Sequence, residues 1–123
     1  MDTLSAFISY SSVDKHLAGR LKSFLQIYGG YEIFVAHDDL TGGTIFTEEI
    51  VKFVIKADLF IPLLSPSFKE SDFTNQETGM AVALHKKIIP VKLEAINPYG
   101  FISKYHAIPL KAIKPQYPYP DRG

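Results

Sequence analysis

The stretch LFIPLL at residues 59–64 is the longest uninterrupted apolar run in the chain, and it decides the fold class. A half-exposed strand alternates apolar and polar residues, whereas a strand that is apolar throughout is typical of a parallel sheet covered by helices on both faces. Pro62 cannot donate a hydrogen bond to a neighbouring strand, so we expect an irregularity there. The run therefore predicts a buried strand at the centre of an α/β domain.

Strand-like runs and helical stripes alternate on either side of this stretch. The changes of period predict further strands over residues 4–8, 32–36, 88–93 and 107–110, and helices over residues 15–28, 46–57 and 73–84. Parallel neighbours require crossover helices, and these crossovers are right-handed. We expect an open sheet of five mainly parallel strands flanked by helices.

Composition excludes several classes of function. The chain has 123 residues, enough for one domain, and its 13 basic side chains balance 13 acidic ones, so no net positive field attracts nucleic acid or an anionic membrane. The absence of cysteine excludes disulfides, thiolate metal sites and a cysteine nucleophile. The longest apolar run is far shorter than the roughly 18 residues of a membrane span, and the N-terminus lacks an export signal. We expect a cytoplasmic protein that binds neither nucleic acid nor membrane.

The last residues differ in composition from the rest. Residues 115–123, PQYPYPDRG, contain three prolines and no helical stripe. We expect one domain over residues 1–113 and a proline-rich linker or tail over residues 114–123, with a possible C-terminal sensor or effector domain beyond it.

Four short motifs follow one another along the chain. They are FISYSSVD at residues 7–14, YEIFV with HDDL and a glycine pair at residues 31–43, LSPS at residues 64–67, and SDFTNQE at residues 71–77. In order and spacing they resemble the TIR (Toll/interleukin-1 receptor) domain family, and the last resembles the aromatic-x-x-x-Glu motif of its NAD-cleaving, prokaryotic-type members. The similarity extends from about Leu4 to Leu110. The chain departs from the family in having Phe73 where tryptophan is common, and in lacking a recognisable final helix.

The resemblance implies a flavodoxin-like strand order, 2-1-3-4-5, and a NAD+ glycohydrolase that releases nicotinamide and forms ADP-ribose or a cyclic isomer. It implies that Glu77 is the catalytic carboxylate, with NAD+ as substrate and neither metal nor cofactor. The residues implied to contact the substrate are Ser9, Tyr10, Ser11, Ser12, Asp39, Ile45 and Phe73. Self-association with other TIR domains, often through the loop at residues 37–43, and a role in immune or antiphage signalling are implied as well.

Glu77 also stands out without the resemblance. It lies four residues after Phe73 and four before Ala81, so a carboxylate interrupts an apolar helical stripe. The spacing Thr74-x-x-Glu77 also fits a capping box, in which Glu77 bonds back to the helix start, and a surface glutamate is a further alternative. Spacing alone favours these structural alternatives, whereas the family motif favours catalysis.

Hydroxyl groups gather where two expected strands end, at residues 9–14 and 65–67. In the flavodoxin-like order, ligands bind beyond the carboxyl ends of strands one and three. Both segments therefore suit hydrogen bonds to ribose and pyrophosphate. Helix capping by Ser11 and Asp14 is the alternative interpretation.

Other functions find less support. A phospho-receiver domain needs an aspartate after the third strand, where the chain has Leu64-Ser65-Pro66, and neither a Rossmann fingerprint nor a P-loop occurs. The acidic residues of the loop at 37–43 lack further ligands for a metal. Two alternatives stay open: a non-enzymatic TIR adaptor that acts through TIR–TIR contact, and an enzyme similar to nucleoside deoxyribosyltransferases.

Overall fold

A computed structural model of the chain describes residues 3–37 and 43–113. Within these residues, six short strands form one sheet in the order β2-β1-β3-β5-β6, with β4 also paired to β3, and every pairing is parallel. The strands are β1 (Ser5–Tyr10), β2 (Glu32–His37), β3 (Leu59–Leu64), β4 (Lys87–Ile88), β5 (Val91–Lys92) and β6 (Ile108–Pro109). The predicted open parallel sheet, with its 2-1-3-4-5 order, is confirmed once β4 and β5 are taken as two halves of the predicted fourth strand.

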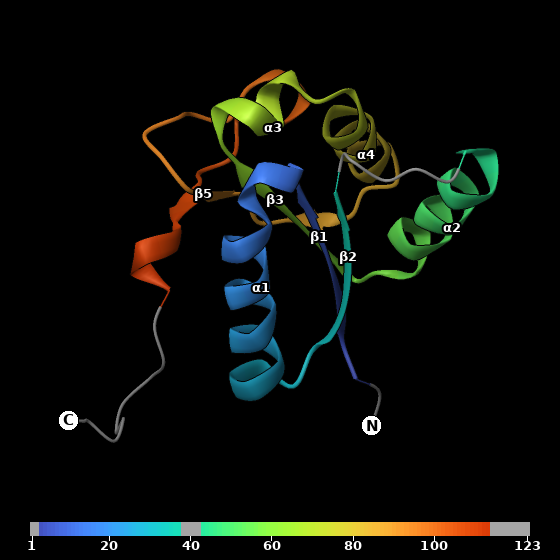
Figure 1. Cartoon of the computed structure of the whole chain (residues 1–123), viewed down its shortest axis with the longest axis horizontal. Coiled ribbons are helices and arrows are strands. Elements are labelled where there is room, and N and C mark those ends of the chain that lie inside the picture. The colour runs from blue at the N-terminus through green and yellow to red at the C-terminus, as the bar shows by residue number, and fades with distance from the viewer. Residues whose placement is uncertain (1–2, 38–42, 114–123) are drawn as a thin grey trace.

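Helices cover both faces of this sheet, and Figure 1 shows α1 on one side of the strands with α2 and α4 on the other. The helices are α1 (Lys15–Phe24), α2 (Gly43–Lys56), α3 (Pro66–Glu70) and α4 (Asp72–Ala83). A π-helical turn at Leu25–Gly29 prolongs α1 and ends at Gly30, whose φ of 66° is accessible to glycine at little cost. The described part of the chain also has 3₁₀ turns at Ser12–Asp14, Gly100–Ile102 and Leu110–Ala112.

Alternation along β1 divides the core into two halves. Phe7 packs with Phe60, Leu64 and the inner faces of α2 and α4, and the rings of Phe7 and Phe60 stack 5.7 Å apart. Ala6, Ile8 and Tyr10 face α1 instead. Within the described residues, no helix combines the length and the apolar character needed to cross a membrane.

Four predicted elements are wrong in detail. The first strand runs to Tyr10, so Ser9 and Tyr10 lie in the sheet and not in the loop after it. The turn expected at residues 65–67 opens α3, because Ser65 caps that helix and Pro66 occupies its first position. The fourth strand breaks at Pro90, which has no N–H to donate, and the last strand shortens to two residues before a 3₁₀ turn.

Candidate functional site

Glu77 lies in the middle of α4 and is buried between that helix and β1. Only 3% of its surface is exposed, and its Oε1 accepts a hydrogen bond of 2.6 Å from the hydroxyl of Ser9. Ser9 is fully buried near the carboxyl end of β1, on the same face of the sheet as Phe7. Strand alternation explains this contact, because residues 5, 7 and 9 all point toward the side covered by α4.

Both structural alternatives for Glu77 are therefore wrong. The N-cap of α4 is Ser71, whose hydroxyl accepts from the backbone N–H of Thr74 at 3.3 Å. Thr74 itself turns inward and donates to the carbonyl of Phe68 at 2.7 Å. Glu77 thus lies beyond the first turn, too far along the helix for a capping box, and it is too buried to be a surface glutamate.

A side-chain network fixes α4 to its surroundings. Asn75 donates to the carbonyls of Lys69 and Ser71, each at 2.8 Å, and accepts from the hydroxyl of Tyr99 at 2.8 Å. The ammonium group of Lys69 lies 5.2 Å from the centre of the Tyr99 ring. Burial raises the pKa of Tyr99 from its usual 10 to about 12, so the phenol stays protonated and able to donate. These contacts hold the helix that carries Glu77.

A second serine–carboxylate pair joins the ends of β1 and β3. Ser65 donates to Oδ2 of Asp14 at 2.6 Å while accepting from the N–H of Phe68 at 3.1 Å. Ser11 and Asp14 occupy the N-cap positions of the 3₁₀ turn and of α1, but neither side chain makes the hydrogen bond that the capping alternative requires. Sequence reasoning missed this pair, since its two members are separated by 51 residues and each fits ordinary turn chemistry.

The other predicted site residues lie on different elements and on both faces of the sheet. Phe73 is half-buried on α4, one turn before Glu77. Tyr10 is buried on the opposite face, packed toward α1. Ser11 is buried just after β1, and Ser12, half-buried, begins the next turn. The structure therefore brings Ser9 and Glu77 into contact, places Phe73 one helical turn from Glu77, and separates Tyr10 from them.

Two predicted contacts cannot be compared with the structure. Asp39, together with residues 38–42 of the loop expected to mediate assembly, lies outside the described residues. Ile45 lies within α2, but its side chain is also outside the described part.

The arrangement can perform one kind of chemistry without further groups. A carboxylate held by a neutral donor at the carboxyl edge of an open parallel sheet can stabilise positive charge that develops on a bound ligand. Its burial strengthens such an effect, because the interaction between charges grows as the surrounding dielectric falls.

Comparisons with known proteins identify the family. A family model described as TIR domain matches residues 6–117, nearly the whole chain, whereas no curated protein matches significantly. The TIR domain of the Toll-related receptor TRR-2 from Hydra magnipapillata has a TM-score of 0.70 at 20% identity, covering 85% of this chain and 82% of that one. The CMP N-glycosidase BcmB of Clostridium botulinum has a TM-score of 0.57 at 26% identity, covering 80% and 77%.

A third similar structure is part of an activated assembly. The TIR domains of the activated Roq1 resistosome, which directly recognises the pathogen effector XopQ, have a TM-score of 0.60 at 20% identity, covering 73% of this chain and 57% of that one. The family match, the strand order and the aromatic-x-x-x-Glu segment of α4 agree with one another. The chain belongs to the TIR domain family.

Proposed function

We propose that the chain is a TIR-domain N-glycosidase that cleaves the bond between nicotinamide and ribose in NAD+. The observation that carries this proposal is the burial of Glu77 on α4, with its carboxylate held by Ser9 at the carboxyl edge of the sheet. Phe73 lies one helical turn earlier on the same helix, and in this proposal its ring contacts the substrate. NAD+ is the substrate in this proposal, and no metal or cofactor takes part.

The reaction needs little from the protein. NAD+ joins ribose C1′ to the nitrogen of a cationic pyridinium ring, and when that bond breaks its electron pair stays on the nitrogen. Nicotinamide therefore leaves as a neutral molecule and takes no proton from the enzyme. Ordinary glycoside hydrolysis uses two carboxylates, but here a single one suffices.

Glu77 supplies that carboxylate in its ionised form. Positive charge develops on C1′ and the ribose ring oxygen as nicotinamide departs, and a preorganised negative charge stabilises it. Water then bonds to C1′ and releases a proton, which gives ADP-ribose, or an adenine nitrogen or a hydroxyl of the same molecule bonds there and gives a cyclic isomer. Ser9 acts through Glu77, because its hydroxyl is buried and bonded to that carboxylate.

The similarity to BcmB supports cleavage of an N-glycosidic bond. That protein is a CMP N-glycosidase, and CMP, like NAD+, joins a base nitrogen to C1′ of a phosphorylated ribose. The same similarity favours a second candidate, an N-glycosidase of simple nucleotides such as CMP. The two candidates share Glu77 and differ in the base that departs.

Assembly is part of the proposal. We expect the domain to act when copies associate, as suggested by a fold relative found within an activated resistosome. A C-terminal sensor or effector beyond the tail at residues 114–123 would control that association, in immune or antiphage signalling.

The test measures base release from NAD+ and, in parallel, from CMP. The full chain is assayed when concentrated and when fused to an oligomeriser, with Glu77→Gln and Glu77→Ala as variants and Glu70→Gln as the control. Glutamine still accepts the Ser9 hydrogen bond but has no charge, so we expect Glu77→Gln to fold and to lose about 100-fold or more in kcat. Glu70 is exposed on α3, so Glu70→Gln should retain full activity.

Each outcome has a definite meaning. Release of cytosine but not nicotinamide would replace NAD+ by a simple nucleotide as substrate. Release that persists in both Glu77 variants would remove Glu77 from catalysis. No release of either base, even when the domain is crowded, would leave the chain as a TIR adaptor that works by protein contact alone.

A further inference from the structure

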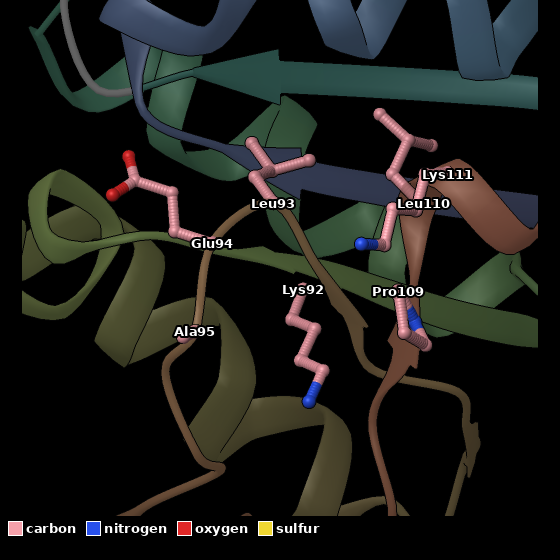
Figure 2. A pocket seen from close by; sticks show the side chains of 7 residues that line it. All are labelled: Lys92, Leu93, Glu94, Ala95, Pro109, Leu110 and Lys111. Carbon is pink, nitrogen blue, oxygen red and sulfur yellow. The ribbon is translucent and has the colours of Figure 1, made fainter.

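A pocket of about 340 Å³ opens at the carboxyl ends of β5 and β6, on the same edge of the sheet as the ends of β1 and β3. Residues 92–95 and 109–111 line it, as Figure 2 shows. Its volume is near the lower limit for pockets that hold small ligands. The carboxyl edge of an open parallel sheet is also the edge where ligands bind.

Two ammonium groups give this pocket its chemical character. The side chains of Lys92 and Lys111 come from opposite walls, and that of Lys92 points toward the side of α4 (Figure 2). The carboxylate of Glu94, also on the rim, points away from both ammonium groups. Within the described residues, no ion pair engages the side chains of these three residues. The positive charges are therefore available to an anion.

Register places Lys92 on the face of the sheet that carries Glu77. Lys92 pairs with Leu64 of β3, and Ser9 pairs with Pro62 two residues earlier on the same strand. Side chains two apart on a strand, and those of paired residues, share a face. Because β3 alone separates β1 from β5, the backbones of Ser9 and Lys92 are two strand spacings apart across the sheet and two residues apart along it, which is about 12 Å in all.

We propose that Lys92 and Lys111 form the phosphate subsite of the ligand site, and that they bind the phosphate groups of a dinucleotide whose nicotinamide ribose lies at Glu77. This inference rests on the proposed function, because it takes the substrate to be NAD+. In a dinucleotide the phosphates follow the reacting ribose directly, and the long side chains of Glu77 and Lys92 bridge part of the distance between the two strands, so one ligand can reach both groups.

The chemistry of the pocket fits this ligand. Lysine binds phosphate as a compact point charge that several oxygen atoms can share. Leu93, Pro109 and Leu110 provide apolar walls beside the two charges, which strengthens their field in the pocket. The chain has no net positive charge, so recognition of a doubly charged pyrophosphate depends on a local pair of this kind.

The test combines turnover with direct binding. KM and kcat are measured for nicotinamide release from NAD+ and from nicotinamide riboside, which has no phosphate, with wild type, Lys92→Gln, Lys111→Gln and the double variant. Binding of ADP-ribose and of inorganic pyrophosphate is measured by calorimetry on the same proteins. Lys104→Gln, which removes an exposed charge elsewhere on the chain, is the matched control.

We expect the double variant to raise KM for NAD+ about tenfold or more, with kcat within about twofold of wild type. It should weaken ADP-ribose and pyrophosphate binding to a similar extent and leave cleavage of the riboside unchanged, and Lys104→Gln should do none of this. An unchanged KM for NAD+, or an equal loss for the riboside, overturns the inference while the NAD+ activity stands.

The binding arm separates the two proposals. If wild type releases no nicotinamide but binds ADP-ribose, and the lysine variants bind it less well, the phosphate site stands and the proposed reaction fails. If wild type binds neither ADP-ribose nor pyrophosphate, or if the variants bind both as tightly as wild type, the phosphate site is refuted whatever the activity.

Discussion

Glu77 is the only acidic or basic side chain among the buried residues that the structure describes. Removing a carboxylate from water costs several kcal/mol unless hydrogen bonds replace the lost hydration, so its position opposes folding as much as it supports it. The hydroxyl of Ser9 offsets part of that cost, since a hydrogen bond to a charged group contributes about 1.5–3 kcal/mol. Such a local conflict is typical of residues retained for their chemistry.

Ser9→Ala tests whether Ser9 positions Glu77. The variant removes the donor and leaves the carboxylate in place, so Glu77 keeps its charge but loses the contact that fixes its orientation. We expect kcat for nicotinamide release to fall about 10- to 100-fold with KM for NAD+ little changed. The free energy of unfolding, measured in urea, should fall by about 1–3 kcal/mol.

Ser5→Ala is the matched control for this variant. Ser5 begins the same strand, points to the same face and is also buried, but its hydroxyl contacts Asp58 at the amino end of the sheet. Its loss should reduce stability by about 1–2 kcal/mol and leave kcat unchanged. If Ser9→Ala retains full kcat while both variants lose similar stability, Ser9 has only a structural role.

The sequence identified Glu77 but not its partner, and the reason is physical. A carboxylate on an apolar stripe is visible from helical spacing alone. Ser9 followed an apolar run and preceded more hydroxyl residues, so it looked like the start of a loop, whereas hydrogen bonding to β2 and β3 carries β1 on to Tyr10. The pair Asp14–Ser65 was not predicted for a related reason. The two residues are far apart in the sequence and meet only because the ends of β1 and β3 lie side by side in the sheet.

At the scale of elements, Lys86 stabilises the end of α2 from outside that helix. Its ammonium group donates to the carbonyls of Ile55 and Ala57 at 2.5 and 2.7 Å. The last carbonyls of a helix lack partners within it, and a positive charge there also interacts favourably with the helix dipole. We expect Lys86→Met to lower the free energy of unfolding by about 1–2 kcal/mol in urea titrations.

Lys87→Met is the control for this prediction. Lys87 is the next residue, is exposed and contacts no carbonyl among the described residues. We expect it to change stability by less than about 0.5 kcal/mol. Equal effects of the two substitutions would contradict a capping role for Lys86.

The Asp14–Ser65 pair should couple β1, β3 and α3. Ser65 also caps α3, so Ser65→Ala alone loses two interactions and cannot isolate the pair. A double-mutant cycle with Asp14→Ala separates them, and we expect a coupling energy of about 0.5–2 kcal/mol from urea unfolding. Strict additivity of the two substitutions would mean that the hydrogen bond between them contributes nothing to stability.

The sequence predicted the long helices and the central strand more accurately than the short elements. The long stripes of α1, α2 and α4, and the apolar run of β3, were placed correctly to within a few residues, because burial imposes a period on each of them. The five residues of α3 are too few for a period to show, although a serine followed by proline is a recognised helix start. The break between β4 and β5 at Pro90 was not predicted, because the apolar residues around Pro90 continue the pattern of one strand.

At the scale of the whole molecule, the long connection between β5 and β6 is tied to α4. Tyr99 forms the link, because its hydroxyl donates to Asn75 and the ammonium group of Lys69 lies over its ring. Residues 93–107 contain no strand and no helix longer than a 3₁₀ turn, so this link anchors a segment that has little regular structure of its own. The same segment adjoins the pocket that holds Lys92, so the anchor also supports one wall of the proposed phosphate subsite.

The raised pKa of Tyr99 makes this anchor sensitive to alkaline pH. Burial raises the pKa from 10 to about 12, so the folded protein holds the phenolic proton more tightly than the unfolded chain does. The stabilising contribution is complete below pH 10, and it is lost progressively as the pH rises from 10 toward about 12, because the unfolded chain releases its proton first. Urea unfolding of wild type should therefore show stability falling with pH across this interval.

Tyr99→Phe isolates this effect from the other groups that titrate in alkali. The variant cannot ionise at residue 99, and the remaining tyrosines and lysines are common to both proteins, so their contributions cancel in the difference between the two. Near pH 8 wild type should be more stable by about 0.5–1.5 kcal/mol, the contribution of one neutral hydrogen bond. That difference should narrow above pH 10 as the phenol of the unfolded wild type ionises. If the difference in the free energy of unfolding between wild type and Tyr99→Phe stays constant from pH 8 to pH 11, then Tyr99 has the same pKa in the folded and unfolded chains. Neither burial nor the hydrogen bond to Asn75 would then stabilise the protonated phenol.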